Sequence, residues 1–310
     1  MKFFLLLFSC LLLTGCQWKE SFTGDSSTTV ENLPSFSPTF TLKEGIELPS
    51  APETFEEIVA VLERMVVEDV MYMEVPYPYD LVDLGLYESY LYAYQRAYQK
   101  VNATHIEYTS NTMVYYTGYK KDDSGNFFMA LERDDERYTE TEIMEQNAYF
   151  RQRVQEIFDY LKESGQYTEN KTEMEQIKVL YDFTAGHLSY DYDYEYADSA
   201  FTAYGAVTVQ QVVCQGYVAL FNALLRLAGF QAEGVIGVSM DSGERHIWTQ
   251  VKLGDTWHYF DPTYGDRPTW TAEEGDLQFN YTYFDMTEET MLYDRKITHY
   301  QVNNDTLILP

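Results

Sequence analysis

One cysteine in the second half of the sequence has the surroundings of a sulfur nucleophile. Cys214 opens a stretch in which apolar residues recur at helical spacing until Gly229; they are Val218, Phe221, Leu225 and Ala228. The first turn of a helix presents unpaired N–H groups and the positive end of the helix dipole, and both favour a thiolate. A buried structural cysteine is the alternative for any such residue taken alone. Cys214 is therefore a candidate nucleophile that needs a base.

A candidate base and its partner follow from a predicted hairpin. Residues 245–253 and 256–261 have the pattern of strands, and Gly254-Asp255 between them is typical of a two-residue turn. That turn fixes a register in which His246 lies on the same sheet face as Asp261 and diagonal to it. A carboxylate that accepts from one ring nitrogen leaves the other to meet the thiol. The alternative is a histidine and an aspartate that merely pair at the surface.

The same register provides a comparison within the hairpin. It places His258 opposite Val251, on the other face of the sheet. Of the five histidines, only His246 has a carboxylate placed on its own sheet face by local geometry.

The residues around these side chains resemble the transglutaminase-like superfamily. The motifs are Val213-Cys214-Gln215-Gly216-Tyr217, Arg245-His246-Ile247-Trp248 and Tyr259-Phe260-Asp261-Pro262-Thr263, in the order and at spacings similar to the family's. Ser189-Tyr190-Asp191 and Thr202-Ala203-Tyr204-Gly205-Ala206 also look like the lead-in of bacterial members. The resemblance covers about residues 172–283. It implies Cys214 as nucleophile, His246 as general base and then acid, and Asp261 as orienter, on a papain-like α+β core with the nucleophile helix packed on an antiparallel sheet.

Two features of the resemblance stay open. The oxyanion would be met by the Cys214 backbone N–H and one further donor. Tyr204 is a candidate for that donor, and a tyrosine packed beside the helix is the alternative. Ile247 and Thr249 stand where bacterial relatives often carry Ala and Asn, so acceptor access or substrate shape could differ here.

The first residues predict export and lipidation. Lys2 precedes an apolar run, residues 3–13, that is too short to span a bilayer and is typical of a signal peptide. Leu13-Thr14-Gly15-Cys16 resembles the lipobox of bacterial lipoproteins, which implies lipidation at Cys16 and an extracytoplasmic, lipid-anchored location at the bacterial cell membrane. Cys214 would then be the only thiol of the mature chain. An uncleaved anchor or ordinary secretion is the alternative.

Four segments are predicted along the chain. Residues 1–15 are the signal peptide, and residues 16–52, rich in Ser, Thr and Pro, form a tether. Residues 53–165 form an accessory α+β domain, with helices over 54–70, 84–101 and 140–163 and strands over 106–119 and 127–133. Residues 166–310 form the transglutaminase-like domain, whose first helix begins at the capping box of Thr172 and Glu175 and whose strands begin at 233–240.

Composition excludes several functions. The chain has 310 residues, 50 acidic against 21 basic, for a formal net charge of -29, which argues against nucleic acid as a partner. The acidic ladder of residues 190–195 lacks the Gly and Glu that a calcium loop of the EF-hand type needs, so no metal or cofactor is expected. A redox-sensing role for Cys214 lacks a second cysteine as partner.

The predicted chemistry is acyl transfer from an amide bond through a thioester on Cys214. Proteolysis, amidase or deamidase activity and protein cross-linking share this chemistry, and the substrate is a protein or peptide, with cell-envelope proteins as one source. The membrane is contacted through the lipid anchor alone, and the oligomeric state is not predicted. The alternative function is a catalytically silent surface binding or adhesion module.

Overall fold

The computed structural model describes residues 46–48, 50–77, 84–109, 113–134, 137–193, 195–266, 279–298, 301–303 and 306–308. All of them fall in one compact unit, residues 37–310. The predicted signal peptide, Cys16 and most of the predicted tether lie outside the described residues. Within the described ranges, every helix is too short or too polar to cross a bilayer.

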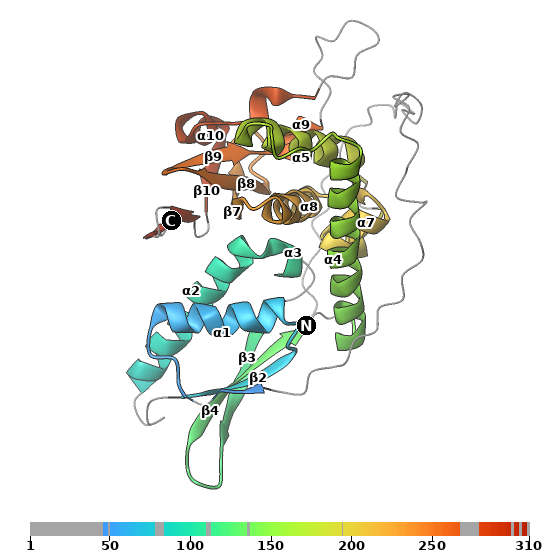
Figure 1. Cartoon of the computed structure of the whole chain (residues 1–310). Helices are drawn as coiled ribbons and strands as arrows, with labels where there is room; N and C mark the ends of the chain where they lie inside the picture. Colours follow the sequence, from blue (N-terminus) through green and yellow to red (C-terminus); the bar gives the residue numbers. More distant parts are fainter. Residues whose placement is uncertain are drawn as a thin grey trace, which may run out of the picture. The chain divides into compact units, whose positions relative to one another are not determined.

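The N-terminal part is a four-stranded sheet with helices packed on it (Figure 1). Its strand order is β1 (Ile46–Glu47), β2 (Tyr72–Pro76), β4 (Phe127–Asp134) and β3 (Met113–Lys121), with β1 parallel to β2 and the other pairs antiparallel. α1 (Phe55–Val67) begins at a capping box of Thr54 and Glu57. Its apolar face packs with α2 (Leu84–Thr104) over β2 and β4.

The predicted strand over residues 106–119 is wrong in its first residues. They form a short helix, α3 (Ile106–Thr109), and β3 starts only at Met113. Ile106 is buried against α8, and Glu107 is buried beside Arg226 of that helix. These contacts with a distant part of the chain override the local pattern that favours a strand.

Two long helices lead into the second part. α4 (Glu140–Glu163) and α5 (Glu173–His187) each begin at a capping box, formed by Thr139 with Glu142 and by Thr172 with Glu175. The apolar side of α4 lies in the same core as α5 and α8; it comprises Phe150, Val154, Ile157, Phe158 and Leu161. α4 thus supports the nucleophile helix from the predicted accessory segment, and the division at residue 165 stays a prediction.

The second sheet is antiparallel, in the order β10 (Arg295–Ile297), β7 (Gln231–Ser239), β8 (Arg245–Leu253) and β9 (Thr256–Phe260). α8 (Cys214–Leu227) packs on it (Figure 1). A Cβ on Gly237 would lie 2.3 Å from the carbonyl oxygen of Lys296, so only glycine lets β10 approach β7 this closely. The predicted α+β core, with the helix that begins at Cys214 packed on an antiparallel sheet, is confirmed.

Short elements complete the described chain. They are β5 (Ser189–Tyr190), α6 (Ala197–Ala200), α7 (Ala203–Thr208), β6 (Gln211–Val212), α9 (Pro262–Gly265), η2 (Tyr281–Tyr283), α10 (Glu288–Asp294), β11 (Gln301–Asn303) and β12 (Thr306–Ile308).

Candidate active site

Cys214 is the first residue of α8. The preceding residue, Val213, is extended, and no side chain caps the helix there. The positive end of the helix therefore stays open to a negatively charged group. The Cys214 side chain is partly exposed, whereas Val218 and Phe221 on the same helix are fully buried. The thiol thus lies at the boundary between core and solvent, where a substrate can reach it.

His246 and Asp261 meet as the hairpin register predicts. Leu253 pairs with Thr256 and Val251 with His258. His246 Nε2 lies 2.7 Å from Asp261 Oδ2, and the two side chains are 7% and 0% exposed. Because Nε2 is occupied by the carboxylate, Nδ1 is the ring nitrogen that remains for Cys214.

The Cys214 thiol reaches His246. The thiol helps to raise the pKa of the His246 imidazole, so the two side chains interact although they come from α8 and β8, far apart in the sequence. His246 is the second residue of β8, so its ring lies at the end of the sheet, next to the first turn of α8. The fold thus brings together all three predicted side chains.

The charges of the pair reinforce each other. Burial opposes a charged imidazole, but attraction to Asp261 and the hydrogen bonds to Asp261 and Cys214 outweigh it and raise the pKa of His246 to about 10. Burial likewise opposes a charged carboxylate, but His246 and Arg295 hold the pKa of Asp261 well below its usual range. At neutral pH the pair is therefore an imidazolium and a carboxylate.

Neighbouring groups fix the orientation of the His246 ring and of the Asp261 carboxylate. The Tyr264 ring stacks on the His246 ring at 4.7 Å between centroids. Tyr264 N donates to Asp261 Oδ1 over 3.3 Å, and the Tyr181 hydroxyl donates to the Asp261 carbonyl over 3.1 Å. Asp261 is thus the N-cap of α9 as well as the partner of His246.

Arg295 is a residue of the site that sequence analysis missed. Its Nη2 lies 2.7 Å from Asp261 Oδ2, and its side chain is 1% exposed. It follows Asp261 by 34 residues and comes from β10, which pairs with β7. Local register cannot reach across that separation, and no motif marks Arg295 in the sequence.

Tyr204 stays a predicted oxyanion donor. It lies on α7, with its ring edge-on to Tyr149 of α4 at 5.5 Å between centroids. Burial, followed by the charges of Tyr149 and Glu145, raises the pKa of its hydroxyl, so it remains a neutral donor.

The two departures from the family pattern face the helix. Ile247 packs with Ile106 and Val218, with Cys214 against the same cluster. Thr249 is fully buried, and its Oγ1 donates to Asn222 Oδ1 on α8 over 2.7 Å. Thr249 is therefore a packing contact between β8 and α8.

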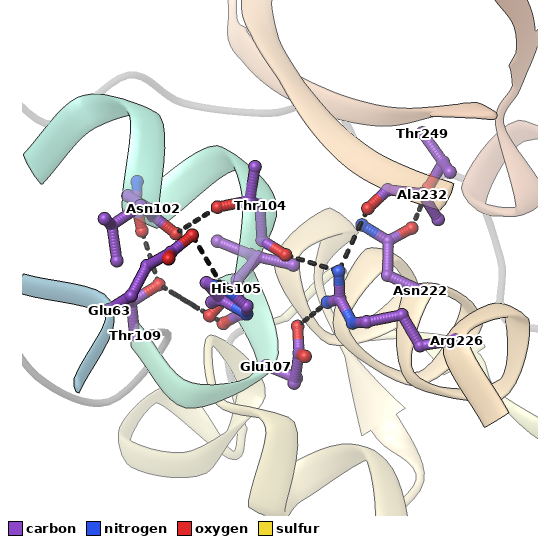
Figure 2. A network of polar contacts seen from close by, with 12 residues as sticks. Glu63, Asn102, Thr104, His105, Glu107, Thr109, Asn222, Arg226, Ala232 and Thr249 are labelled. Carbon is purple, nitrogen blue, oxygen red and sulfur yellow. Dashed lines mark hydrogen bonds and ion pairs between the residues drawn. The ribbon is translucent and has the colours of Figure 1, made fainter. Parts of the chain in front are cut away.

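The far end of α8 is tied to the N-terminal part. Figure 2 shows Arg226 between the carbonyl oxygens of Thr104 and Ala232, with an ion pair to Glu107. Glu107 is 2% exposed, so this pair is largely desolvated. The N-terminal part thus contacts the nucleophile helix both at Arg226 and through Ile106.

The acidic ladder has a structural explanation in Asp191. Its carboxylate accepts from the backbone N–H groups of Glu195 and Tyr196 and from Gln211 Nε2, each over 3.1 Å. Asp191 thereby closes its own loop and joins it to β6. Tyr194 lies outside the described residues, and the described residues hold no cluster of His, Cys, Asp or Glu that suits a metal ion.

Known proteins are similar to part of the chain. Residues 168–262 match the model of the transglutaminase-like superfamily. Human kyphoscoliosis peptidase is 30% identical over 109 residues, which covers 31% of this chain and 16% of that protein. The mouse protein is 28% identical over 109 residues, with the same two shares. The match thus spans a small part of these relatives.

Solved structures show weaker likeness. A structure described as a TGase has a TM-score of 0.33 and 13% identity, covering 69% of this chain and 55% of its own. A structure described as a candidate cysteine protease from Cytophaga hutchinsonii has a TM-score of 0.30 and 14% identity, covering 49% and 64%. Neither bears on activity. The sequence match and the core of α8 on an antiparallel sheet together identify residues 168–262 as a transglutaminase-like domain.

Proposed function

We propose that this protein is a cysteine enzyme that transfers acyl groups from amide bonds through a thioester on Cys214. The observation that carries the proposal is the buried pair of His246 and Asp261, 2.7 Å apart, with the Cys214 thiol beside the same imidazole and raising its pKa. A nucleophile, a base and an orienting carboxylate in that order are the requirement of this chemistry. The matched relative in human carries the name of a peptidase, which agrees with it.

The first half-reaction forms the thioester. The Cys214 thiolate attacks the amide carbonyl carbon, and the carbonyl electron pair moves to the oxygen, which the N–H groups at the start of α8 stabilise. As the C–N bond breaks, the imidazolium of His246 gives its Nδ1 proton to the leaving amine. Asp261 stays ionised throughout and keeps Nε2 of the ring oriented.

The second half-reaction releases the acyl group. Water or an amine attacks the thioester carbon while neutral His246 accepts its proton, and the Cys214 thiolate leaves. With water the product is a carboxylic acid, from proteolysis or deamidation. With a lysine amine it is a cross-link between chains.

The location and substrate class are part of the proposal. The sequence Leu13-Thr14-Gly15-Cys16 supports a lipid anchor at Cys16 on the extracytoplasmic face of a bacterial membrane. An enzyme held there by a tether meets proteins and peptides of the cell envelope. The proposed location therefore favours amide bonds of such proteins as substrates.

Alkylation of Cys214 tests the proposal without a known substrate. Iodoacetamide labelling of the exported chain should be fast at neutral pH and depend on His246. His246→Ala should slow it strongly, whereas the matched variant His258→Ala should label like wild type because His258 pairs instead with Asp285. Labelling with the pH midpoint of an ordinary thiol, unchanged in His246→Ala, would leave the surface binding module as the function.

A peptide library then identifies the reaction. Mass spectrometry separates hydrolysis of the backbone, deamidation of a side chain and cross-linking by the mass change of the peptide. If Cys214 labelling depends on His246 but no peptide is turned over, the substrate is not a peptide of the library. The same measurement is then made with intact envelope proteins.

A further inference from the structure

Two cations share one carboxylate oxygen in the site. Asp261 Oδ2 lies 2.7 Å from His246 Nε2 and 2.7 Å from Arg295 Nη2. All three side chains are at least nine-tenths buried. Charge-assisted hydrogen bonds of this length are strong, and water does not screen them in such an environment.

The surroundings of Arg295 hold its guanidinium in one place. Its carbon Cζ lies 5.5 Å from the ring centre of Trp248, 5.0 Å from that of Tyr264 and 4.8 Å from that of Tyr283. Its Nη1 pairs with Asp294, whose side chain is 22% exposed. The guanidinium is thus stacked among aromatic rings and fixed at both ends, so the oxygen of Asp261 that it binds is fixed too.

The backbone also serves this placement. β10 carries Arg295 and pairs with β7, with Arg295 opposite Ser239. Gly237 permits that approach, since any Cβ there would also lie 2.7 Å from the Trp248 ring. Arg295 lies outside the segment that matches the family model, residues 168–262.

We propose that Arg295 is a positioning residue of the active site, which aims Oδ2 of Asp261 at His246 and limits how tightly the carboxylate holds the imidazolium. The proposal rests on the proposed function and adds a fourth member to the chain of charges. An Asp261 that served His246 alone would stabilise the imidazolium more strongly. Sharing Oδ2 with a second cation eases transfer of the Nδ1 proton to the leaving amine.

The charged groups that face the guanidinium set the direction of the test. They are Asp261 and Asp294 as bound carboxylates and His246 across Oδ2, and the titratable but neutral tyrosines Tyr181, Tyr264 and Tyr283 face it as well. Loss of the Arg295 charge removes a repulsion from the imidazolium, so His246 should keep its proton to higher pH. Loss of the Asp294 charge should act in the opposite direction.

The experiment compares alkylation of Cys214 by iodoacetate and by iodoacetamide across pH in the full chain. A protonated His246 attracts the anionic reagent, so the ratio of the two rates falls at the pH where the imidazolium is lost. Arg295→Met should move that midpoint to higher pH, Arg295→Lys should keep it near wild type, and Asp294→Asn should move it to lower pH. With a peptide substrate, kcat should fall by about tenfold to a hundredfold in Arg295→Met, with KM little changed.

Controls separate positioning from stability. Arg133 is another buried arginine, bound to the carbonyl oxygens of Met65, Val66 and Tyr108 in the N-terminal part, so Arg133→Met should lower the unfolding temperature and leave the midpoint unchanged. If Arg295→Met does not fold, the opposite shift of Asp294→Asn still tests the proposal. Equal midpoints in wild type, Arg295→Met and Asp294→Asn would overturn it, while His246-dependent labelling of the wild type would keep the proposed function intact.

Discussion

The same small sheet carries two histidine–carboxylate pairs whose N–O distances differ by only 0.1 Å but whose surroundings differ. His246 and Asp261 lie 2.7 Å apart and are 7% and 0% exposed. His258 and Asp285 lie 2.6 Å apart and are 30% and 39% exposed. The buried pair has a thiol at one end and an arginine at the other, and the exposed pair has a threonine hydroxyl, that of Thr256. Distance alone therefore does not distinguish the two pairs; burial and the groups at their two ends do.

The largest contrast is expected for the two imidazoles. His246→Ala should lower kcat/KM for an amide substrate by up to about 10⁶-fold, since the base and nucleophile act as a unit. His258→Ala should change it less than twofold, because its side chain touches Asp285 and Thr256 and not Cys214. Steady-state turnover of the best library peptide measures both. A comparable loss in His258→Ala would break the comparison.

Neutralising the two carboxylates should have effects on activity that differ almost as much. Asp261→Asn should reduce kcat by about 10⁴-fold, because the amide cannot stabilise the imidazolium as a carboxylate does. Asp285→Asn should be nearly silent. Circular dichroism must show both variants folded, since Asp261→Asn also removes a partner of buried Arg295. Equal activity of the two variants would mean that the hairpin register does not select the working partner.

The pH dependence of stability should follow the buried pair. The raised pKa of His246 means that its contribution to stability is fully present below about pH 6.5 and is lost as pH rises toward about 10. The lowered pKa of Asp261 means that its contribution is present above about pH 4 and is lost as pH falls. The free energy of unfolding, measured with urea, should therefore fall by a few kcal/mol from pH 6.5 to 10.

Matched variants assign that decline to one pair. It should be weaker in His246→Ala and unchanged in His258→Ala. A decline that persists in His246→Ala would place its origin in other groups.

The smallest effect is expected on the face of the sheet that carries His258. Thr249 lies there but is covered by α8 and bonded to Asn222. Thr249→Val should lower the free energy of unfolding by about 1 kcal/mol, the net value of one buried hydrogen bond. Asn222 and Thr249 lie away from the reacting atoms, so the midpoint of Cys214 alkylation should stay near wild type. A large shift of that midpoint would show that this face also sets the position of the thiol.

The features that depend on neighbouring residues could be predicted from the sequence. Capping boxes fixed the start of α5, and Gly254-Asp255 fixed the register that brings His246 to Asp261. Both depend on residues within a few positions of one another. The helical spacing after Cys214 likewise predicted α8 and its end near Gly229.

Features that depend on contacts between distant residues could not be predicted from the sequence. α3 is helical because Ile106 and Glu107 dock on α8, which no neighbouring residue reveals. β2 is a short strand that ends at Pro76. Its extended conformation depends on pairing with β4, which lies more than 50 residues further along the chain. Arg295 joins the site through a strand that pairs with β7, so only the assembled sheet shows its role.

The order of these residues along the chain has a consequence for synthesis. The thiol of Cys214 is made first, then the imidazole, then the carboxylate, and the strand that carries Arg295 comes last of the four. If the chain is exported as proposed, it would carry a thiol without its full set of partners until β10 had emerged and paired with the edge of β7. Reactivity would then begin outside the cell, after translocation, and spare the proteins that the chain passes on its way.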